Sequence, residues 1–393
     1  MKKINRRDFL EGSAGVATAA ALLPLIAVGQ SVRAHGNVAA EAWPENGTLI
    51  PDEGWRLWVD REAEWKQDEI FLPEDVTQDA EGMVRGKGKP LPVHPPTGGW
   101  DVLGGRPEGS IEVNLPGTVE QHFWGKYGAG EDGKPRAYTP QEYRYAADDP
   151  VPQNGAYFGV SWWWREIEIP ASMQGKRIFL HVRGAHLRAE VYLNEKLVGY
   201  SIMEELPFEA ELTHAAKPGG KNVLAIRITN PFGRFDWVDG LNEQWGAVKI
   251  YRSHGFGGLD RGMTISAHER VRIKDAWVLN TPDPKKIVAQ VAVEFTVAPN
   301  AVYNVPIRVE VVDPTSSTVI AHQNRGIDIL LSGGAKNGER VVGTLESPLS
   351  VPDAEVWDLA NPRLYHLRVT IPFGSLSDTR TIVFGFRSFA VDG

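Results

Sequence analysis

Cysteine is absent from all 393 residues, which excludes disulfides, thiolate metal sites and cysteine nucleophiles together. An excess of basic charge is also missing, because the formal net charge at pH 7 is −8. A nucleic-acid partner needs a basic face for its phosphates, so we expect none. Beyond residue 34 no stretch is apolar enough to cross a bilayer, so we expect no membrane contact once a signal has been removed.

Short catalytic motifs are missing as well. The sequence contains no G-x-S-x-G nucleophile elbow, phosphate-binding loop or dinucleotide-binding glycine pattern. His181 and His186 lie five apart around Gly184, a spacing that suits neither a helix face nor a strand face, so we expect no metal pair there. Glu204 and Glu205 would point to opposite faces of a strand, and we interpret them as a solvated loop. We therefore expect no catalytic residue in this chain.

The first 34 residues are typical of an export signal. Arg6 and Arg7 form the paired arginines of a twin-arginine signal, and an apolar run from Gly12 to Val28 follows. The small residues up to Ala34 predict cleavage after Ala34. An uncleaved anchor is the alternative, although the run is short for a bilayer span. We expect the mature chain to be periplasmic or secreted.

Most of the remaining chain shows the period-two alternation of half-buried strands, and its 41 glycines and 27 prolines suit many turns. The sequence therefore predicts an all-β protein. The segments predicted as strands are 55–60, 111–117, 157–170, 177–183, 189–199, 222–230, 263–268, 271–279, 287–297, 307–311, 364–371 and 381–386.

The front of the chain is the least regular part. Residues 61–68 favour a short polar helical turn, whereas residues 76–110 and 125–155 are rich in Gly and Pro and are expected to be loops. Residues 119–124 continue the apolar alternation of the preceding strand.

Three parts follow from these patterns. Residues 1–34 are the signal, and residues 35–270 form a first β-sandwich with an irregular N-terminal part at 35–155. Residues 271–393 form a second sandwich, since about seven short strands at regular spacing are typical of an immunoglobulin-like domain.

A candidate binding segment follows the strand at 222–230. It alternates aromatic side chains with acidic and amide ones, the combination that stacks on a sugar ring and hydrogen-bonds its hydroxyls. The alternative is that its tryptophans, like others among the 13, only pack at the edge of the sandwich. The candidate carbohydrate-binding residues are Asp236, Trp237, Asp239, Asn242, Glu243, Trp245 and His254.

Several segments of the first sandwich resemble family 2 glycoside hydrolases, the group of β-galactosidases, β-glucuronidases and β-mannosidases. They are Val113-Asn-Leu-Pro-Gly117, Trp163-Trp-Arg165, the hairpin from Val191 to Gly199, and Gly257-Gly-Leu-Asp-Arg261. Glu195 stands where the family usually has Gly, so we expect a less tight turn there. The resemblance implies a galactose-binding-like jelly-roll sandwich.

The second sandwich carries the same resemblance. Trp357-Asp-Leu-Ala-Asn-Pro-Arg-Leu-Tyr-His-Leu367 is similar to a hallmark of the family's immunoglobulin-like domain, and residues 384–393 resemble the strand that leads into its catalytic barrel. The resemblance implies that both catalytic glutamates lie in a (β/α)₈ barrel of about 250 further residues, in cis or from a split gene. It also implies that residues 236–254 reach toward the mouth of that barrel.

Three functions follow as hypotheses. The first is the non-catalytic N-terminal portion of an exported family 2 glycoside hydrolase that acts on β-linked sugars. The second is a stand-alone exported carbohydrate-binding protein, and the third is an adhesion module without a ligand. The DNA after Gly393 would discriminate among them. No cofactor is expected, although jelly rolls often hold a structural calcium through Asp, Asn and backbone oxygens.

Overall fold

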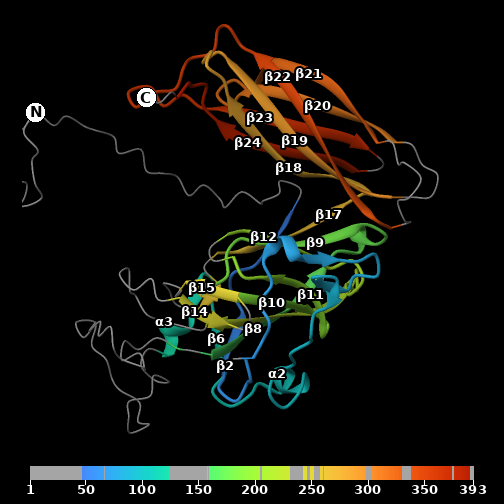
Figure 1. The fold of residues 1–393 in the computed structure, drawn as a ribbon, viewed down its shortest axis with the longest axis vertical. Helices are drawn as coiled ribbons and strands as arrows, with labels where there is room; N and C mark the ends of the chain where they lie inside the picture. Colours follow the sequence, from blue (N-terminus) through green and yellow to red (C-terminus); the bar gives the residue numbers. More distant parts are fainter. Residues whose placement is uncertain are drawn as a thin grey trace, which may run out of the picture. The chain divides into compact units, whose positions relative to one another are not determined.

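The structure is a computed structural model, and its strands form two β-sandwiches (Figure 1). It describes residues 47–65, 67–123, 157, 159–203, 206–230, 242–245, 248–251, 257–259, 261–297, 303–329, 338–373 and 376–389. Strands dominate these residues, so the all-β prediction is confirmed. Within the same residues, no helix is long and apolar enough to span a bilayer.

The first sandwich pairs a four-stranded sheet with a six-stranded one. The smaller sheet has the order β1 (Thr48–Ile50), β17 (Met263–His268), β9 (Arg177–Val182) and β12 (Phe208–Glu211). The larger has the order β11 (Lys196–Ser201), β10 (Arg188–Leu193), β13 (Gly220–Asn230), β8 (Gly159–Ile169), β2 (Trp55–Asp60) and β6 (Ile111–Val113). All neighbouring strands within these two sheets are antiparallel.

Both faces of the larger sheet are buried, because aromatic residues occupy successive positions of β8. Trp163 lies opposite Ile226 and Leu57 and packs into the main core between the two sheets. Trp162 and Trp164 point to the other face, where Trp100 covers them. These tryptophans are core residues, as the packing interpretation expects.

Several short elements form in residues 73–123, so the expectation of loops at 76–110 is wrong in part, and Leu103 of one of them packs on this outer face. They are η1 (Pro73–Asp75), β3 (Val76–Gln78), β4 (Val84–Gly86), β5 (Lys89–Pro90), α2 (Asp101–Gly105), β7 (Gly117–Thr118) and α3 (Val119–Phe123). Phe71, Val84 and Leu91 form a small separate core with Tyr200. A turn forms at residues 61–62, where the N–H of Ala63 donates to the carbonyl oxygen of Asp60 at 3.4 Å, although no helix follows it in residues 63–65. Residues 119–123 are helical rather than extended.

The hairpin between β10 and β11 has a two-residue turn, since Leu193 lies opposite Lys196. Asn194 and Glu195 adopt left-handed backbone conformations, with φ of 49° and 70°. The expectation of a less tight turn at Glu195 is therefore wrong. Glu195 takes the conformation that favours glycine, and the rest of the sheet holds the turn closed.

The second sandwich begins with β18 (Val271–Asn280), which shares no sheet with the strands before it. One sheet has the order β18, β19 (Lys286–Thr296) and β22 (Arg340–Ser350). The other has the order β21 (Thr318–Ile329), β20 (Tyr303–Asp313), β23 (Tyr365–Phe373) and β24 (Leu376–Phe384). Alternate residues of β19 and β20, such as Val291 and Val309, fill a core of their own.

Candidate functional site

The predicted carbohydrate-binding residues fall mostly outside the part of the chain that the structure describes. Asp236, Trp237, Asp239 and His254 lie outside the described residues. Asn242, Glu243 and Trp245 lie on β14 (Asn242–Trp245), of which the backbone alone is described. β14 pairs with the antiparallel strand β15 (Val248–Tyr251), and Trp245 lies opposite Val248. Two paired strands therefore form where we expected a continuous loop, and the assignment of these side chains to sugar stays a prediction.

The root of this segment is described, and a buried carboxyl group lies there. The segment leaves the first sandwich after Asn230 and returns at Gly257, whose carbonyl oxygen accepts the N–H of Val119 at 2.8 Å. The neighbouring Glu120 is only 3% exposed and its Oε1 accepts the N–H of Tyr157 at 2.9 Å. Three segments that are distant in the sequence therefore meet at Glu120.

The environment of Glu120 favours its neutral form. Burial raises the pKa of Glu120 to about 7, although the N–H groups of Tyr157 and Gly257 act in the opposite direction. A buried carboxyl group that ionises near neutral pH can be a functional group, and it can equally be a structural one. Glu120 adjoins the hydrogen bond between Val119 and Gly257, and Gly257 follows the predicted binding segment in the sequence. This is the reason to test Glu120.

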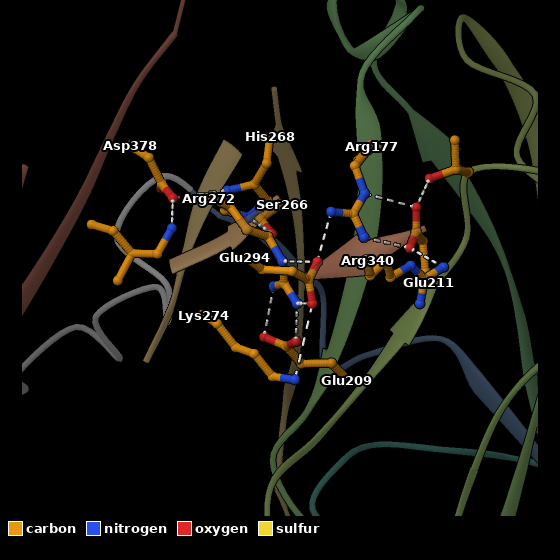
Figure 2. Close-up of polar contacts among 12 residues, drawn as sticks. Arg177, Glu209, Glu211, Ser266, His268, Arg272, Lys274, Glu294, Arg340 and Asp378 are labelled. Atoms are coloured by element: carbon orange, nitrogen blue, oxygen red, sulfur yellow. Dashed lines mark hydrogen bonds and ion pairs between the residues drawn. The ribbon is translucent and has the colours of Figure 1, made fainter. Parts of the chain in front are cut away.

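A cluster of buried charges joins the two sandwiches, and Figure 2 shows it. It combines side chains from β9 and β12 of the first sandwich with side chains from β18, β19 and β22 of the second. The members of this seam cluster are Arg177, Glu209, Glu211, Arg272, Glu294 and Arg340.

Arg272 lies at the centre of the seam cluster and is 3% exposed. Its guanidinium forms two hydrogen bonds with Glu209, at 2.7 and 3.1 Å, and its Nε donates to Glu294 at 3.0 Å. It therefore binds one carboxylate from each sandwich. Two parallel N–H···O bonds to one carboxylate are the strongest and most directional form of ion pair.

Two further arginines extend the cluster across the same boundary. Arg177 donates to both carboxylate oxygens of Glu211, at 3.2 and 2.8 Å, and its Nη1 lies 2.6 Å from Glu294. Arg340 of the second sandwich lies 2.7 Å from Glu211 of the first. Cations and anions thus alternate along the boundary, and each sandwich supplies both signs.

The electrostatics of the seam cluster keep its carboxylates ionised. Burial alone would raise the pKa of Glu294, but Arg272 and Arg177 outweigh it and lower that pKa to about 2. The pKa values of Glu209 and Glu211 are lowered for the same reason, against the effect of burial. Because all three carboxylates are engaged by guanidinium groups, they suit holding the sandwiches together and do not suit acid–base catalysis.

A row of four polar side chains lies beside the seam cluster. We call this row the histidine chain, and it consists of His181, Ser266, His268 and Asp378. Ser266 Oγ lies 2.7 Å from His181 Nε2 and 2.8 Å from His268 Nε2. His268 Nδ1 lies 3.3 Å from Asp378 Oδ2, and Figure 2 shows Ser266, His268 and Asp378 in this arrangement.

The order Ser266–His268–Asp378 resembles that of a hydrolytic triad, but a nucleophile needs access to substrate. Ser266 is 0% exposed, and its hydroxyl is held between two imidazoles. The cavity beside the chain has a volume of about 10 Å³, which is space for about one water molecule. This arrangement is therefore a buried hydrogen-bond network without a substrate site.

A wide cleft borders the seam cluster and is lined by both sandwiches. Its volume is about 1270 Å³. Its lining mixes charges of both signs with largely buried aromatic rings, and it includes Asp79, Tyr200, Phe208, Arg272, Arg340 and Arg380. No three His, Asp or Glu side chains of the described residues are grouped for a metal ion, and the expectation of a structural calcium stays a prediction.

The seam cluster and the histidine chain are absent from our sequence-based predictions. Glu209 and Arg272 are 63 residues apart, and no local pattern pairs them. The available signal is a charged residue inside an otherwise apolar strand, such as Glu294 between Val293 and Phe295. That signal marks a polar contact without naming its partner.

The fold defines an all-β protein built from two packed pairs of antiparallel sheets. Residues 3–23 match the twin-arginine translocation signal, which directs the chain to the periplasm or to secretion. Residues 271–387 match the family described as Glycosyl hydrolases family 2. The family match covers the second sandwich, which is therefore similar to a domain of glycoside hydrolase family 2.

Curated relatives match about 60% of the chain at low identity. A Beta-glucuronidase of Formosa agariphila is 22% identical over 251 residues, which cover 60% of this chain and 24% of the relative. Beta-galactosidase BoGH2A of Bacteroides ovatus is 23% identical over 239 residues, which cover 60% of this chain and 25% of the relative. The chain thus spans about a quarter of the length of these relatives.

Solved structures show the same fold. A glycosyl hydrolase family 2 member from Bacteroides cellulosilyticus superposes with a TM-score of 0.54 at 16% identity, over 88% of this chain and 36% of that one. A Bacteroides uniformis beta-glucuronidase gives a TM-score of 0.54 at 16% identity, over 88% of this chain and 33% of that one. At these identities the likeness concerns the fold alone.

Proposed function

We propose that this chain is the N-terminal, non-catalytic portion of an exported family 2 glycoside hydrolase that acts on β-linked sugars. The observation that carries the proposal is the family match at residues 271–387, which lies behind a first sandwich of the same structural class. The names of the curated relatives, a β-glucuronidase and a β-galactosidase, support β-linked sugars as the substrate class.

The proposed carbohydrate contact is the segment from Asp236 to His254. Its residue types, indole rings among carboxylate and amide groups, suit stacking on a pyranose and hydrogen bonding to its hydroxyls. The proposed partner is a (β/α)₈ barrel, in the same polypeptide or from a separate gene. The chain's coverage of about a quarter of its curated relatives supports a role as one portion of a larger enzyme.

A turnover assay on the purified 393-residue chain tests the non-catalytic role. The substrates are the 4-nitrophenyl β-galactoside, β-glucuronide and β-mannoside. We expect no nitrophenol release above the buffer rate while circular dichroism reports folded strands. Release that rises in proportion to chain concentration would overturn the proposal.

A second candidate function is stand-alone carbohydrate binding after export. Two observations favour this candidate function. Each sandwich has its own core, and buried ion pairs join the two sandwiches. Such a protein needs no barrel to fold. A glycan array probed with the labelled chain tests this candidate, and a silent array removes it.

A further inference from the structure

A second, smaller cavity lies at the boundary of the two sandwiches, and we call it the boundary pocket. Its volume is about 340 Å³. The first sandwich supplies the loop between the 3₁₀ helix η2 (Ala171–Met173) and β9, together with the segment between β12 and β13. Arg270, which precedes β18, and Thr296, the last residue of β19, complete the lining. The pocket therefore depends on both sandwiches.

The described lining of the boundary pocket carries positive charge only. Its charged side chains are Lys176, Arg177 and Arg270, and none of the described residues that line it is Asp or Glu. The larger cleft, in contrast, is lined by charges of both signs. Because the whole chain has a net charge of −8, such a lining is opposite in sign to the molecule as a whole. It favours an anionic ligand over a cationic one.

Arg270 is the cation of this lining whose charge is not balanced. Lys176 pairs with Glu269, and Arg177 pairs with two carboxylates of the seam cluster. Arg270 is exposed, and its guanidinium has no hydrogen-bond or ion-pair partner among the described residues. An ion in solution can therefore reach it. A guanidinium presents parallel N–H groups that match the oxygens of a carboxylate, sulfate or phosphate.

Thr296 provides an independent observation at the same pocket. Its Oγ1 atom is buried and has no hydrogen-bond partner among the described residues. A buried hydroxyl without a partner is costly, so a ligand oxygen that accepts its hydrogen is stabilising. The N–H of Thr296 donates to the carbonyl oxygen of Arg270 at 2.9 Å, which holds the two residues side by side. One cavity thus combines an unbalanced guanidinium with an unsatisfied hydroxyl.

We propose that the boundary pocket binds a small oxyanion, namely a sulfate, phosphate or carboxylate group. Ligand sites usually have volumes of roughly 300–1,000 Å³, so this pocket suits one such group rather than an extended chain. The group is either a free ion or the charged substituent of a sugar, since the pocket recognises the oxyanion itself. The proposal does not rest on the predicted binding segment, because no lining residue lies in 236–254.

Isothermal titration of the 393-residue chain at constant ionic strength tests the proposal. The ligands are inorganic sulfate, galactose 6-sulfate and glucuronate, with galactose as the uncharged control. We expect saturable binding of sulfate that depends on Arg270. Any affinity for galactose should be the same in the parent and in Arg270→Gln, because it would arise outside this pocket. If the Arg270-dependent affinity is higher for a charged sugar than for sulfate, the ligand is a sugar-borne group, and otherwise it is the free ion.

Arg270→Gln is the test variant, and Arg325→Gln, at an exposed position of β21, is its matched control. Both replace an exposed arginine, so we expect both to fold. Arg270→Gln should weaken sulfate binding at least tenfold, Thr296→Val should weaken it about threefold, and Arg325→Gln should leave it unchanged. The proposal is overturned if the parent shows no saturable sulfate binding up to about 10 mM, or if Arg270→Gln binds sulfate with the affinity of the parent.

Discussion

Arg272 is the seam residue that offers the clearest single-residue test, because it binds both Glu209 and Glu294. Its guanidinium binds two carboxylates while almost fully buried, so its removal leaves Glu209 and Glu294 without their main counter-charge. We expect Arg272→Met to lower the free energy of unfolding by about 3–5 kcal/mol, the usual cost of an uncompensated buried charge. Urea unfolding followed by tryptophan fluorescence measures it.

Arg308→Met is the control for this substitution. Arg308 pairs with Glu310 at 2.7 Å, but its side chain is 49% exposed. Because Arg308 is half exposed and Arg368 also pairs with Glu310 at 2.8 Å, we expect Arg308→Met to cost below about 1 kcal/mol. Equal losses in the two variants would contradict the assignment of Arg272 as a buried link between the sandwiches.

Glu120 predicts a pH dependence of the opposite sign to that of ordinary carboxylates. Its folded-state pKa is raised from 4.5 to about 7, so it contributes stability below pH 4.5 that is lost as the pH rises through 7. A shift of this size corresponds to at most about 3 kcal/mol. We expect Glu120→Gln to be more stable relative to the parent at pH 8 than at pH 5. Parallel pH profiles in urea unfolding would refute this.

Glu195 stores backbone strain in the turn between β10 and β11. A non-glycine residue at φ 70° is disfavoured, so Glu195→Gly should raise the free energy of unfolding by about 0.5–1 kcal/mol. Asn194→Gly is the contrasting variant, because the Asn194 side chain bonds Ala215, Asn222 and Val223. We expect it to destabilise the chain. In thermal unfolding, we expect the midpoint temperature to rise in Glu195→Gly and to fall in Asn194→Gly relative to the parent.

At the scale of elements, β12 shows how a short strand can serve two environments. Glu209 and Glu211 are two residues apart and both face the seam cluster, while Ala210 between them packs into the core of the first sandwich. The period of two therefore places charge on one face and an apolar side chain on the other. Two of the four residues of β12 therefore form ion pairs with the second sandwich.

The carboxylates of the seam cluster predict that the free energy of unfolding falls in acid. The pKa values of Glu209, Glu211 and Glu294 are lowered from 4.5, that of Glu294 to about 2, so their stabilisation is lost between about pH 4.5 and 2. We expect a variant with all three changed to Gln to be less stable at pH 6. Its unfolding free energy should also fall less steeply with acid than that of the parent.

Glu166→Gln is the control for this triple variant. Glu166 is exposed and pairs with exposed Lys221 on the larger sheet, which contributes no residue to the seam cluster. Its acid profile should follow the parent in equilibrium unfolding between pH 6 and 2. An unchanged slope in the triple variant would show that the acid response arises elsewhere.

The long strands could be predicted from sequence because alternation over nine or more residues has few competing explanations. β8 and β19 are examples, and their observed bounds differ from the prediction by one or two residues. β3 to β5 could not be predicted, since two or three residues are too few to show a period. In α3, Val119 and Phe123 are four apart, a spacing that strand and helix share, and helix formation decided it.

Less of the site than of the fold could be predicted from the sequence. Family-like segments predicted the first sandwich and nominated a binding segment, which stays a prediction. The pairing of Arg272 with Glu209 could not be predicted, because it depends on the contact between two sandwiches. Nothing local in the sequence encodes that contact. The Ser266–His268 spacing of two residues is equally ordinary, and becomes meaningful only when His181 and Asp378 approach from other strands.

At the scale of the whole molecule, two sandwiches are joined by buried charge in a chain that carries a twin-arginine export signal. Its stability does not depend on disulfides, because the chain has no cysteine. The main cores of the two sandwiches, two smaller apolar clusters and one ionic boundary hold the described residues together. The part of the account that bears most directly on function is the assignment of carbohydrate contacts to residues 236–254.

Isothermal titration with an oligosaccharide of β-linked sugars tests that assignment most directly, with Trp245→Ala and Trp277→Ala measured beside the parent. Trp277 is a matched control, since it is 37% exposed on β18 of the second sandwich. The account predicts that Trp245→Ala weakens binding about tenfold or more and that Trp277→Ala leaves it unchanged. Equal affinity of the parent and Trp245→Ala, or loss of binding in both variants, would contradict it.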